Sequence, residues 1–505
     1  MKWSASWIVI FCLVPVLLAA QDQDTSQVWI GRVETQVGYT SNDAVPLWMR
    51  SNQFGSVPAA GLSNSWIGSL YKTYKKPHDP NDFSSVDWGL DVQTRINLAG
   101  KISAQLIEGT VKAKWWIFEG RAGRSKDIMG LNGDTTLSSG NFAVSGNALG
   151  IPKLEIRIPD YYRLPFWDGL ISLKGNFAHG WVGRRLVDHR VFLVPSEDYR
   201  VNSFYHQKSL YGRIGREEAK LNLYGGINHQ AYWGNDRKVY GENHTLNNVE
   251  TFWYVLWGKA YGAPGVPTSK IGNQIGSIDM GLSYDFRNVR LVAYRQNFYD
   301  VGAISKLANI RDGLNGVAFE NLKYKKEGSN HLNWKKLILE FFYSKDQAGY
   351  PWSKATASGD EDYYNNSYYQ EGWSYKGTGL GNPLVVPAAD AREGQVSNPL
   401  KYFISNRVSA LHLGVDMNVY KADVLFKATY ARHSGNFSTS QWGGSTAGEF
   451  GRSYGLFTPV NQFSTYLKAS RDLKRGFSMG LVLSADYGNM LNNSVGSYVS
   501  FAKQW

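Results

Sequence analysis

The residue types that perform catalysis occur in this chain, but their spacing does not favour an enzyme. Nine histidines are scattered through 505 residues, and no two of them have the spacing of metal ligands. In the segment Arg432–Asn436, His433 adjoins Ser434, and a histidine base can activate a serine hydroxyl for hydrolysis. Because neighbouring side chains on a strand point to opposite faces, this pair is not expected to form a hydrogen bond. We therefore predict no catalytic residue.

Two further motifs superficially resemble ligand sites. Lys376–Gly381 (KGTGLG) resembles a phosphate-binding loop, but it follows a polar aromatic loop rather than a strand. Asp360–Asp362 could bind calcium, yet it lacks the alternating spacing of a calcium loop, which favours a solvated loop. The only cysteine is Cys12, so a zinc site is not expected in the exported protein. The sequence predicts no cofactor and no metal.

The most informative stretch is Asp362–Leu384, which is dense in aromatic and amide side chains. Its aromatic residues are Tyr363, Tyr364, Tyr368, Tyr369, Trp373 and Tyr375, and Asn365, Asn366 and Gln370 lie between them. Aromatic faces stack on sugar rings and amides bond sugar hydroxyls, although the same composition suits a protein partner. A third interpretation is an ordered plug that packs its own rings inside a barrel. From the first interpretation we predict the polysaccharide-binding residues Tyr363, Tyr364, Asn365, Asn366, Trp373 and Tyr375.

Alternating apolar and polar side chains mark the strands that would position these residues. The alternation is unbroken from Val86 to Leu98, and it recurs over 411–419, 424–430 and 477–487. In a soluble sandwich the apolar face packs on a core. In a membrane barrel the apolar face meets lipid and the polar face lines the lumen. For a barrel, the expected lipid-facing residues include Val92, Leu413 and Leu481, and the expected lumen-facing residues include Arg95, His412 and Asp486.

The connections between the expected strands favour the barrel. We expect about 18 strands, which begin near residues 28, 63, 86, 105, 137, 152, 170, 206, 219, 277, 289, 312, 335, 408, 423, 462, 477 and 496. From residue 206 onward, short connections such as Gly215–Glu218 and Asp472–Gly476 alternate with the long loops 231–276, 346–407 and 434–461. Outer-membrane barrels combine short periplasmic turns with long extracellular loops. The sequence therefore predicts an all-β fold, a transmembrane antiparallel β-barrel that forms one domain over residues 21–505.

Composition and the N-terminus exclude other classes of membrane protein. The chain has 53 Gly, 31 Tyr, 18 Trp and 23 Phe, which suits twisted strands and excludes a disordered chain. A mean hydropathy of −0.35 excludes a helical membrane protein. Residues 1–20 combine Lys2, an apolar stretch and Ala19–Ala20, which predicts a secretory signal peptide cleaved near Ala20. The protein is therefore expected in the cell outer membrane.

The charge balance is basic, with 54 Lys and Arg against 42 Asp and Glu, a net charge of +12. For an exported barrel, nucleic acid is a poor explanation of this charge. Basic residues fall on expected inward-facing positions, among them Arg95, Lys112 and Lys114, with acidic residues between them. One interpretation is a lumen filled by paired charges. The other is a positive interior that attracts acidic glycans, which makes these three residues candidate polysaccharide-binding residues.

Several segments, in one order over nearly the whole mature chain, resemble the capsule assembly Wzi family. They are Val45–Gly55, Thr136–Phe166, Lys174–Trp181, Tyr205–Gly215, Tyr224–Gly234 and the YYNNSYYQEGWSY loop. The resemblance implies an 18-stranded outer-membrane barrel of the Gram-negative cell envelope. It also implies a lectin-like role in attaching capsular polysaccharide, or another exopolysaccharide, to the cell surface.

The function expected from the sequence is that of a monomeric, non-enzymatic barrel that binds capsular polysaccharide or exopolysaccharide. Its other expected partners are outer-membrane lipid and the barrel insertion machinery, which would read a final strand that ends on Trp505. The alternative is a porin or glycan transport channel, and a third interpretation is an outer-membrane hydrolase. A porin predicts an open, water-filled lumen, whereas an anchor predicts a lumen blocked by inward loops and large side chains.

Overall fold

The computed structural model describes residues 28–58, 61–75, 79, 81–131, 134, 136–188, 199–216, 218–241, 243–263, 266–300, 302–325, 331–348, 361–441 and 454–505. The predicted signal peptide, residues 1–20, lies outside the described residues.

An 18-stranded antiparallel sheet closes on itself to form a barrel. Its strands are β1 (Trp29–Thr40), β2 (Leu62–Lys72), β3 (Val86–Ala99), β4 (Lys101–Trp115), β5 (Phe118–Arg124), β6 (Lys153–Arg163), β7 (Ile171–Leu186), β8 (Arg200–Ile214), β9 (Leu221–Trp233), β12 (Asn273–Asp285), β13 (Val289–Tyr299), β14 (Gly313–Asn321), β15 (Leu332–Tyr343), β20 (Val408–Val419), β21 (Ala422–His433), β22 (Val460–Asp472), β23 (Phe477–Gly488) and β24 (Ser494–Gln504). Each strand pairs with its neighbours in this order, and β1 also pairs with β24, where Arg32 lies opposite Gln504. Closure pairs the backbone groups that an open sheet would expose at its edges.

Trp505 completes the seam where the first and last strands meet. Its backbone exchanges two hydrogen bonds of 3.0 Å with Gly31. The indole of Trp505 lies where a Cβ on Gly31 would collide with it. A glycine at position 31 therefore leaves room for the terminal ring against β1.

Side chains alternate across the wall as the sequence predicts. On β3, Ile96 and Leu98 are exposed on the outer surface while Arg95 is buried in the lumen. On β23, Leu481 is 43% exposed and Asp486 is buried. Val92 and Leu413 share the outward phase, and His412 has the inward one. The outer residues form an apolar band suited to lipid, so the predicted transmembrane antiparallel β-barrel is confirmed. No helix in the described part of the chain is long and apolar enough to cross a membrane.

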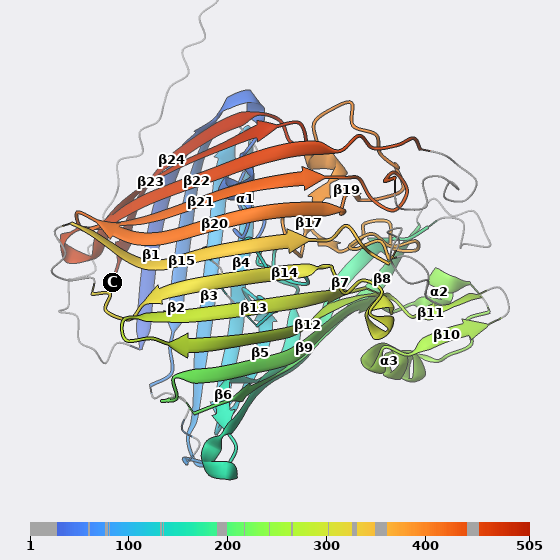
Figure 1. The fold of residues 1–505 in the computed structure, drawn as a ribbon, viewed down its shortest axis with the longest axis horizontal. Helices are drawn as coiled ribbons and strands as arrows, with labels where there is room; N and C mark the ends of the chain where they lie inside the picture. Colours follow the sequence, from blue (N-terminus) through green and yellow to red (C-terminus); the bar gives the residue numbers. More distant parts are fainter. Residues whose placement is uncertain are drawn as a thin grey trace, which may run out of the picture.

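The two ends of the barrel differ (Figure 1). At one end lie Trp505, the start of β1, and turns such as 116–117, 420–421 and 473–476. At the other end lie the connections 41–61, 125–152, 234–272 and 344–407. Outer-membrane barrels have short periplasmic turns and long extracellular loops, so the first end is assigned to the periplasm and the second to the cell exterior.

One of the predicted strands is wrong. The segment near residue 137 is not a strand of the barrel, and β5 (Phe118–Arg124) takes that place in the sheet. Leu137, Phe142 and Val144 gave the segment an apolar character, but all three are buried. β5 was missed because its outward positions include Gly120 and Ala122, which give almost no hydrophobic alternation.

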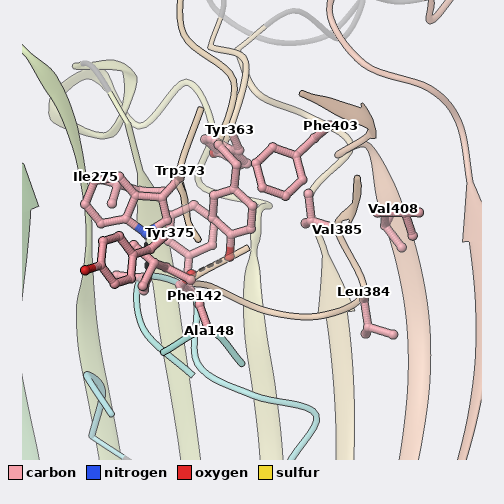
Figure 2. Close-up of a cluster of buried hydrophobic side chains, with 14 of the residues drawn as sticks. Phe142, Ala148, Ile275, Tyr363, Trp373, Tyr375, Leu384, Val385, Phe403 and Val408 are labelled. Atoms are coloured by element: carbon pink, nitrogen blue, oxygen red, sulfur yellow. Dashed lines mark hydrogen bonds between the residues drawn. The ribbon is translucent and has the colours of Figure 1, made fainter. Parts of the chain in front are cut away.

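Small elements occupy the connections at the extracellular end. They are η1 (Ser41–Asp43), α1 (Leu47–Arg50), α2 (Asp236–Tyr240), α3 (Asn248–Trp257), β10 (Ala260–Ala263), β11 (Val266–Lys270), η4 (Ala303–Lys306), β16 (Ser374–Tyr375), β17 (Thr378–Gly379), β18 (Val386–Pro387), η5 (Ala388–Asp390) and β19 (Phe403–Ser405). The periplasmic turns hold η2 (Trp167–Gly169) and η7 (Lys474–Gly476). The largest buried hydrophobic cluster lies within the barrel, where these connections meet the inward faces of the strands (Figure 2).

Candidate functional site: the plug and the extracellular rim

Three connections from the extracellular end enter the lumen, and together we call them the plug. They comprise the described residues within 44–58, 126–151 and 361–387. The first is fixed to the wall by α1, where the backbone N–H of Leu47 donates to Asp486 at 2.8 Å. The indole N–H of Trp48 donates to Thr429 at 2.9 Å. The backbone N–H of Phe54 then donates to Gly146 of the second segment at 2.9 Å, which joins the two segments.

The second segment, 126–151, leaves the wall after β5 and is held by strands on the far side of the barrel. Glu340 of β15 accepts hydrogen bonds from Ser138 Oγ at 2.7 Å and from the backbone N–H of Ser139 at 2.6 Å. Asp279 of β12 accepts one from the backbone N–H of Leu131 at 2.8 Å. Buried carboxylates need such donors, since an unpaired buried charge is costly. The acidic lumen residues of β12 and β15 therefore hold a loop across the barrel.

The third segment, 361–387, packs on the second through side chains that bond its backbone. The indole N–H of Trp373 donates to the carbonyl of Ala143 at 2.7 Å. The hydroxyl of Tyr364 donates to the carbonyl of Phe142. Ser145 returns a backbone N–H bond of 3.0 Å to the carbonyl of Leu380. These bonds satisfy backbone groups that the plug buries away from water.

The rings of the third segment pack against Phe142 of the second segment and against the wall. Phe142 stacks on Phe298 of β13 with ring centroids 4.0 Å apart. Tyr363 meets the same Phe142 ring edge-on at 5.2 Å. The ring centroids of Trp373 and of Tyr232 on β9 lie 4.6 Å apart. Tyr363 and Trp373 are 0% exposed, and Tyr364 and Tyr375 are also buried.

The predicted sugar-stacking role of Tyr363, Tyr364, Trp373 and Tyr375 is therefore corrected. Burial leaves these rings without an open face, so the alternative of an ordered plug holds at these positions. Asn365 is buried as well, and its amide bonds the backbone of Phe403 at 2.9 and 3.0 Å. Asn366 is half-buried and accepts backbone N–H bonds that close a turn. Sequence composition did not distinguish a buried aromatic plug from an exposed binding loop.

The acidic residues Asp312, near the third segment, and Glu361, at its start, accept hydrogen bonds that hold this part of the structure together. The hydroxyl of Tyr363 donates to Asp312 at 2.8 Å, and the backbone N–H of Gln347 donates to the same carboxyl at 2.7 Å. Burial raises the pKa of Asp312 to about 7, against the lowering effect of these hydrogen bonds. Glu361 accepts bonds from Ala303 and Asn309 at 3.0 and 2.9 Å. Asp360 lies outside the described residues, and the described part of the chain has no group of three His, Cys, Asp or Glu residues arranged to hold a metal.

The three basic residues predicted as glycan contacts lie in the lumen, where they meet acidic, amide or aromatic partners. Lys112 forms an ion pair of 2.7 Å with Asp91. Lys114 is buried, with its ammonium 5.7 Å from the centre of the Tyr74 ring. Arg95 donates to Asn97, Gln36 and Ser65 at 2.9, 2.9 and 3.0 Å. These contacts favour the interpretation of a lumen filled by partnered charges. Lys112 and Lys114 lie toward the periplasmic end of β4.

The His433–Ser434 pair and the segment Lys376–Gly381 both form part of the folded framework. His433 ends β21 and is buried, and the backbone N–H of the adjacent Ser434 donates to the carbonyl of Arg407 at 2.9 Å. The segment Lys376–Gly381 contains the turn between β16 and β17, a small hairpin of the plug. Lys376–Gly381 therefore lies in a hairpin and not between a strand and a helix.

A polar cluster at the extracellular rim was missed by sequence reasoning, and we call it the rim cluster. Arg50 of α1 forms an ion pair of 2.7 Å with Asp390, and both side chains are partly exposed. Arg392 donates to the Asn489 side chain at 3.2 Å, and Gln395 donates to the Asn489 carbonyl at 2.6 Å. These residues come from three connections and have no common sequence pattern. Their guanidinium and amide groups can donate to sugar hydroxyls and to acidic groups, and the Asp390 carboxyl can accept from sugar hydroxyls.

Comparisons with known proteins bear on the fold. No protein-family model matches the chain, and no curated protein sequence is detectably similar to it. Among solved structures, the chain is similar to Wzi of Escherichia coli, described as an outer membrane protein involved in group 1 capsule assembly and as a carbohydrate-binding β-barrel. The TM-score is 0.52 at 11% identity, over 95% of this chain and 84% of that one. OccAB4 of Acinetobacter baumannii aligns over 96% of this chain and 100% of that one, with a TM-score of 0.43 and 8% identity.

At 11% identity, the comparison with Wzi supports a conclusion about the fold alone. It agrees with the closed antiparallel β-barrel that the strand pairing shows. The chain is therefore an outer-membrane β-barrel whose lumen holds a buried hydrophobic cluster.

Proposed function

We propose that this protein binds capsular polysaccharide or another exopolysaccharide at the extracellular face of the outer membrane, and that it does so without catalysis. The observation that carries the proposal is the plug. A passive porin needs an open, water-filled lumen, whereas the plug sets a buried hydrophobic cluster within this barrel. A barrel closed in this way acts through its surface.

Two further features support a glycan as the ligand. The chain has the same fold as a solved barrel that is described as binding carbohydrate. The net charge of +12 would attract acidic polysaccharides over a long range. A long polymer held by many copies of the protein would gain avidity even from a weak single site.

The rim cluster is the proposed contact surface, since the aromatic residues of the plug are buried. Arg392 and Gln395 lie close to the exposed Asn489 between β23 and β24, and Arg50 and Asp390 complete the cluster. Charged and amide donors of this kind form directed hydrogen bonds to hydroxyl and carboxylate groups.

The proposal is tested by measuring surface polysaccharide in cells that lack the protein. The deletion strain should shed polysaccharide into the medium, and the wild-type chain should restore the cell-bound fraction. A double variant, Arg392→Ala with Gln395→Ala, should insert normally but restore a smaller cell-bound fraction of polysaccharide than the wild-type chain. Arg216→Ala is a matched control, because Arg216 lies in an exposed pair with Asp168 at the periplasmic end. Full retention of polysaccharide by the deletion strain would refute the proposed function.

A further inference from the structure

Within the connection 234–272, Val239 of α2 joins the buried cluster of the plug, whereas helix α3 packs on the outside of the barrel wall. Val255 of α3 shares a buried cluster with Ala231 and Trp233, whose phase on β9 is outward. Phe252 lies 5.5 Å from Trp233 and 5.8 Å from His206 of β8, measured between ring centroids. Figure 1 shows α3 beside the extracellular ends of β8, β9 and β12. The helix therefore covers part of the surface that faces outward from the barrel.

The wall beneath α3 is unusually polar for an outer surface. Lys208, His229 and Gln274 have the outward phase on β8, β9 and β12. The ammonium of Lys208 donates to the carbonyl of Leu256 at the end of the helix and lies 5.7 Å from the Trp257 ring centre. His229 and Gln274 bond each other at 3.0 Å. Without the helix, these groups would face the surroundings of the barrel, where a charge is costly at membrane depth.

Both ends of α3 are defined by strong local signals. Asn247 caps the first turn by accepting N–H bonds from Val249 and Glu250 at 3.0 and 2.9 Å, and its own backbone N–H donates to the Glu250 carboxyl at 2.9 Å. Gly258 ends the helix in the left-handed conformation, with φ of 59°. This capping box and glycine cap fix which residues face outward.

The face of α3 that points away from the wall is apolar. Val249, Trp253 and Trp257 recur every four residues, which places them on one side of a helix. They are 66%, 50% and 64% exposed. Tyr254, on a different side, packs edge-on against Tyr261 of β10 at 6.0 Å. The helix is thus apolar both toward the wall and on its outer face, and the outer face leaves Val249, Trp253 and Trp257 exposed.

This apolar face continues the lipid-facing band. Leu210, Ile227 and Ile278 are outward and exposed, and the register aligns them across β8, β9 and β12. They lie one outward position nearer the periplasm than Lys208, His229 and Gly276, which are likewise aligned. The helix therefore sits directly above the edge of the band. Tryptophan is enriched at such boundaries, because its ring is apolar and its N–H is polar.

We propose that α3 is an interfacial helix that docks on the outer leaflet of the membrane, with Val249, Trp253 and Trp257 in contact with lipid. A helix at a membrane surface can bind it by burying an exposed apolar face at the boundary between headgroups and acyl chains. On this barrel, the helix both shields the polar wall at Lys208 and extends the lipid contact beyond the strands. This inference is independent of the proposed glycan role.

The test uses nitroxide labels on single cysteines in the full-length barrel, reconstituted in phospholipid vesicles. The only native cysteine is Cys12, in the predicted signal peptide, so single labels are straightforward. Val249→Cys and Trp253→Cys report on the outer face of α3. Leu210→Cys in the lipid band and Glu393→Cys at the extracellular rim serve as controls. Folding of each variant is checked by its heat-modifiable migration on a gel.

Collisions of the nitroxide with oxygen show that the label lies in lipid. Collisions with a water-soluble nickel chelate show that it lies in water. Labels at 249 and 253 should have an oxygen-to-nickel ratio several-fold above that at 393 and close to that at 210. Nickel access at 249 and 253 equal to that at 393 would overturn the proposal, because the helix would then stand in water. Low access to both agents would also overturn it, since another protein surface would then cover the helix.

Discussion

At the scale of single residues, Trp373 shows how the plug is held. Its ring packs against Tyr232 on the wall, and its indole N–H bonds the carbonyl of Ala143 in the neighbouring plug segment. It thereby links three parts of the chain that are far apart in sequence. Removing it should loosen the plug rather than the barrel, because the strands are paired independently of it.

Trp373→Ala is predicted to destabilise the packed plug by about 3–5 kcal/mol, the usual cost of deleting a buried tryptophan side chain. Trp373→Phe keeps an aromatic ring and loses the hydrogen bond, so its effect should be smaller. Limited proteolysis of the 361–387 segment in intact vesicles measures this directly. Equal protease resistance in the wild type and both variants would contradict the assigned role.

Asp236 in α2 makes the extracellular connection sensitive to pH. Burial raises the pKa of its carboxyl to about 7, from an ordinary value of 3.8. Between these values the folded connection keeps a proton that the unfolded one releases. The stabilising contribution is therefore complete below about pH 4 and is lost as the pH rises through about 7.

Amide hydrogen exchange is expected to report this loss. Protection factors across α2 should be higher at about pH 5.5 than at about pH 8, and Asp236→Asn should remove most of the difference. Protection that rises with pH in the wild-type protein would show that the carboxyl is charged when folded.

At the scale of elements, alternation predicted most strands and failed where its physical basis was absent. Strands such as β3 and β23 face lipid on one side, so their sequence carries the period of two. β5 carries Gly120 and Ala122 on its lipid face, which weakens the signal. Residues 137–144 are apolar because they are buried in the plug, and a buried loop gives a similar signal to a strand.

The candidate site was less predictable than the barrel for a related reason. The sequence marked Tyr363 and Trp373 as unusual, but whether a ring faces sugar or protein depends on Phe142 and Tyr232, which contact them from distant segments. The rim cluster could not be predicted, because Arg50 and Asp390 meet only after the barrel has closed.

Leu481 on β23 tests the orientation of the strands. It is exposed on the outer wall, so Leu481→Arg should cost about 2–4 kcal/mol near the bilayer midplane. Leu481→Ala removes the same side chain without adding charge and should cost much less. Urea unfolding of the barrel in vesicles compares the two. An arginine variant as stable as the alanine variant would argue against a lipid-facing position.

At the scale of the whole molecule, the phase of the connections assigns the two ends of the barrel. An epitope inserted between Glu393 and Gly394 should be labelled on intact cells, because this exposed turn lies at the extracellular rim. The same epitope between Lys474 and Arg475, in the turn before β23, should be labelled only after the outer membrane is permeabilised. The opposite labelling pattern would reverse the barrel.

The plug distinguishes a barrel that works through its surface from one that works as a channel. Its three segments are joined to each other and to opposite walls by buried hydrogen bonds and stacked rings. Such a core is not expected to open spontaneously, because opening would expose its apolar surface and leave buried polar groups unpaired. The protein should therefore resist ion flow while remaining fully inserted.

The most direct test of this account is the conductance of the purified barrel in a planar lipid bilayer. The wild-type protein is predicted to insert without a steady open-channel current. A variant in which a glycine–serine linker replaces residues 138–147 should lose the bonds to Glu340 and Trp373 and gain current. A stable open channel in the wild-type protein would contradict the plugged lumen and, with it, the case against a porin.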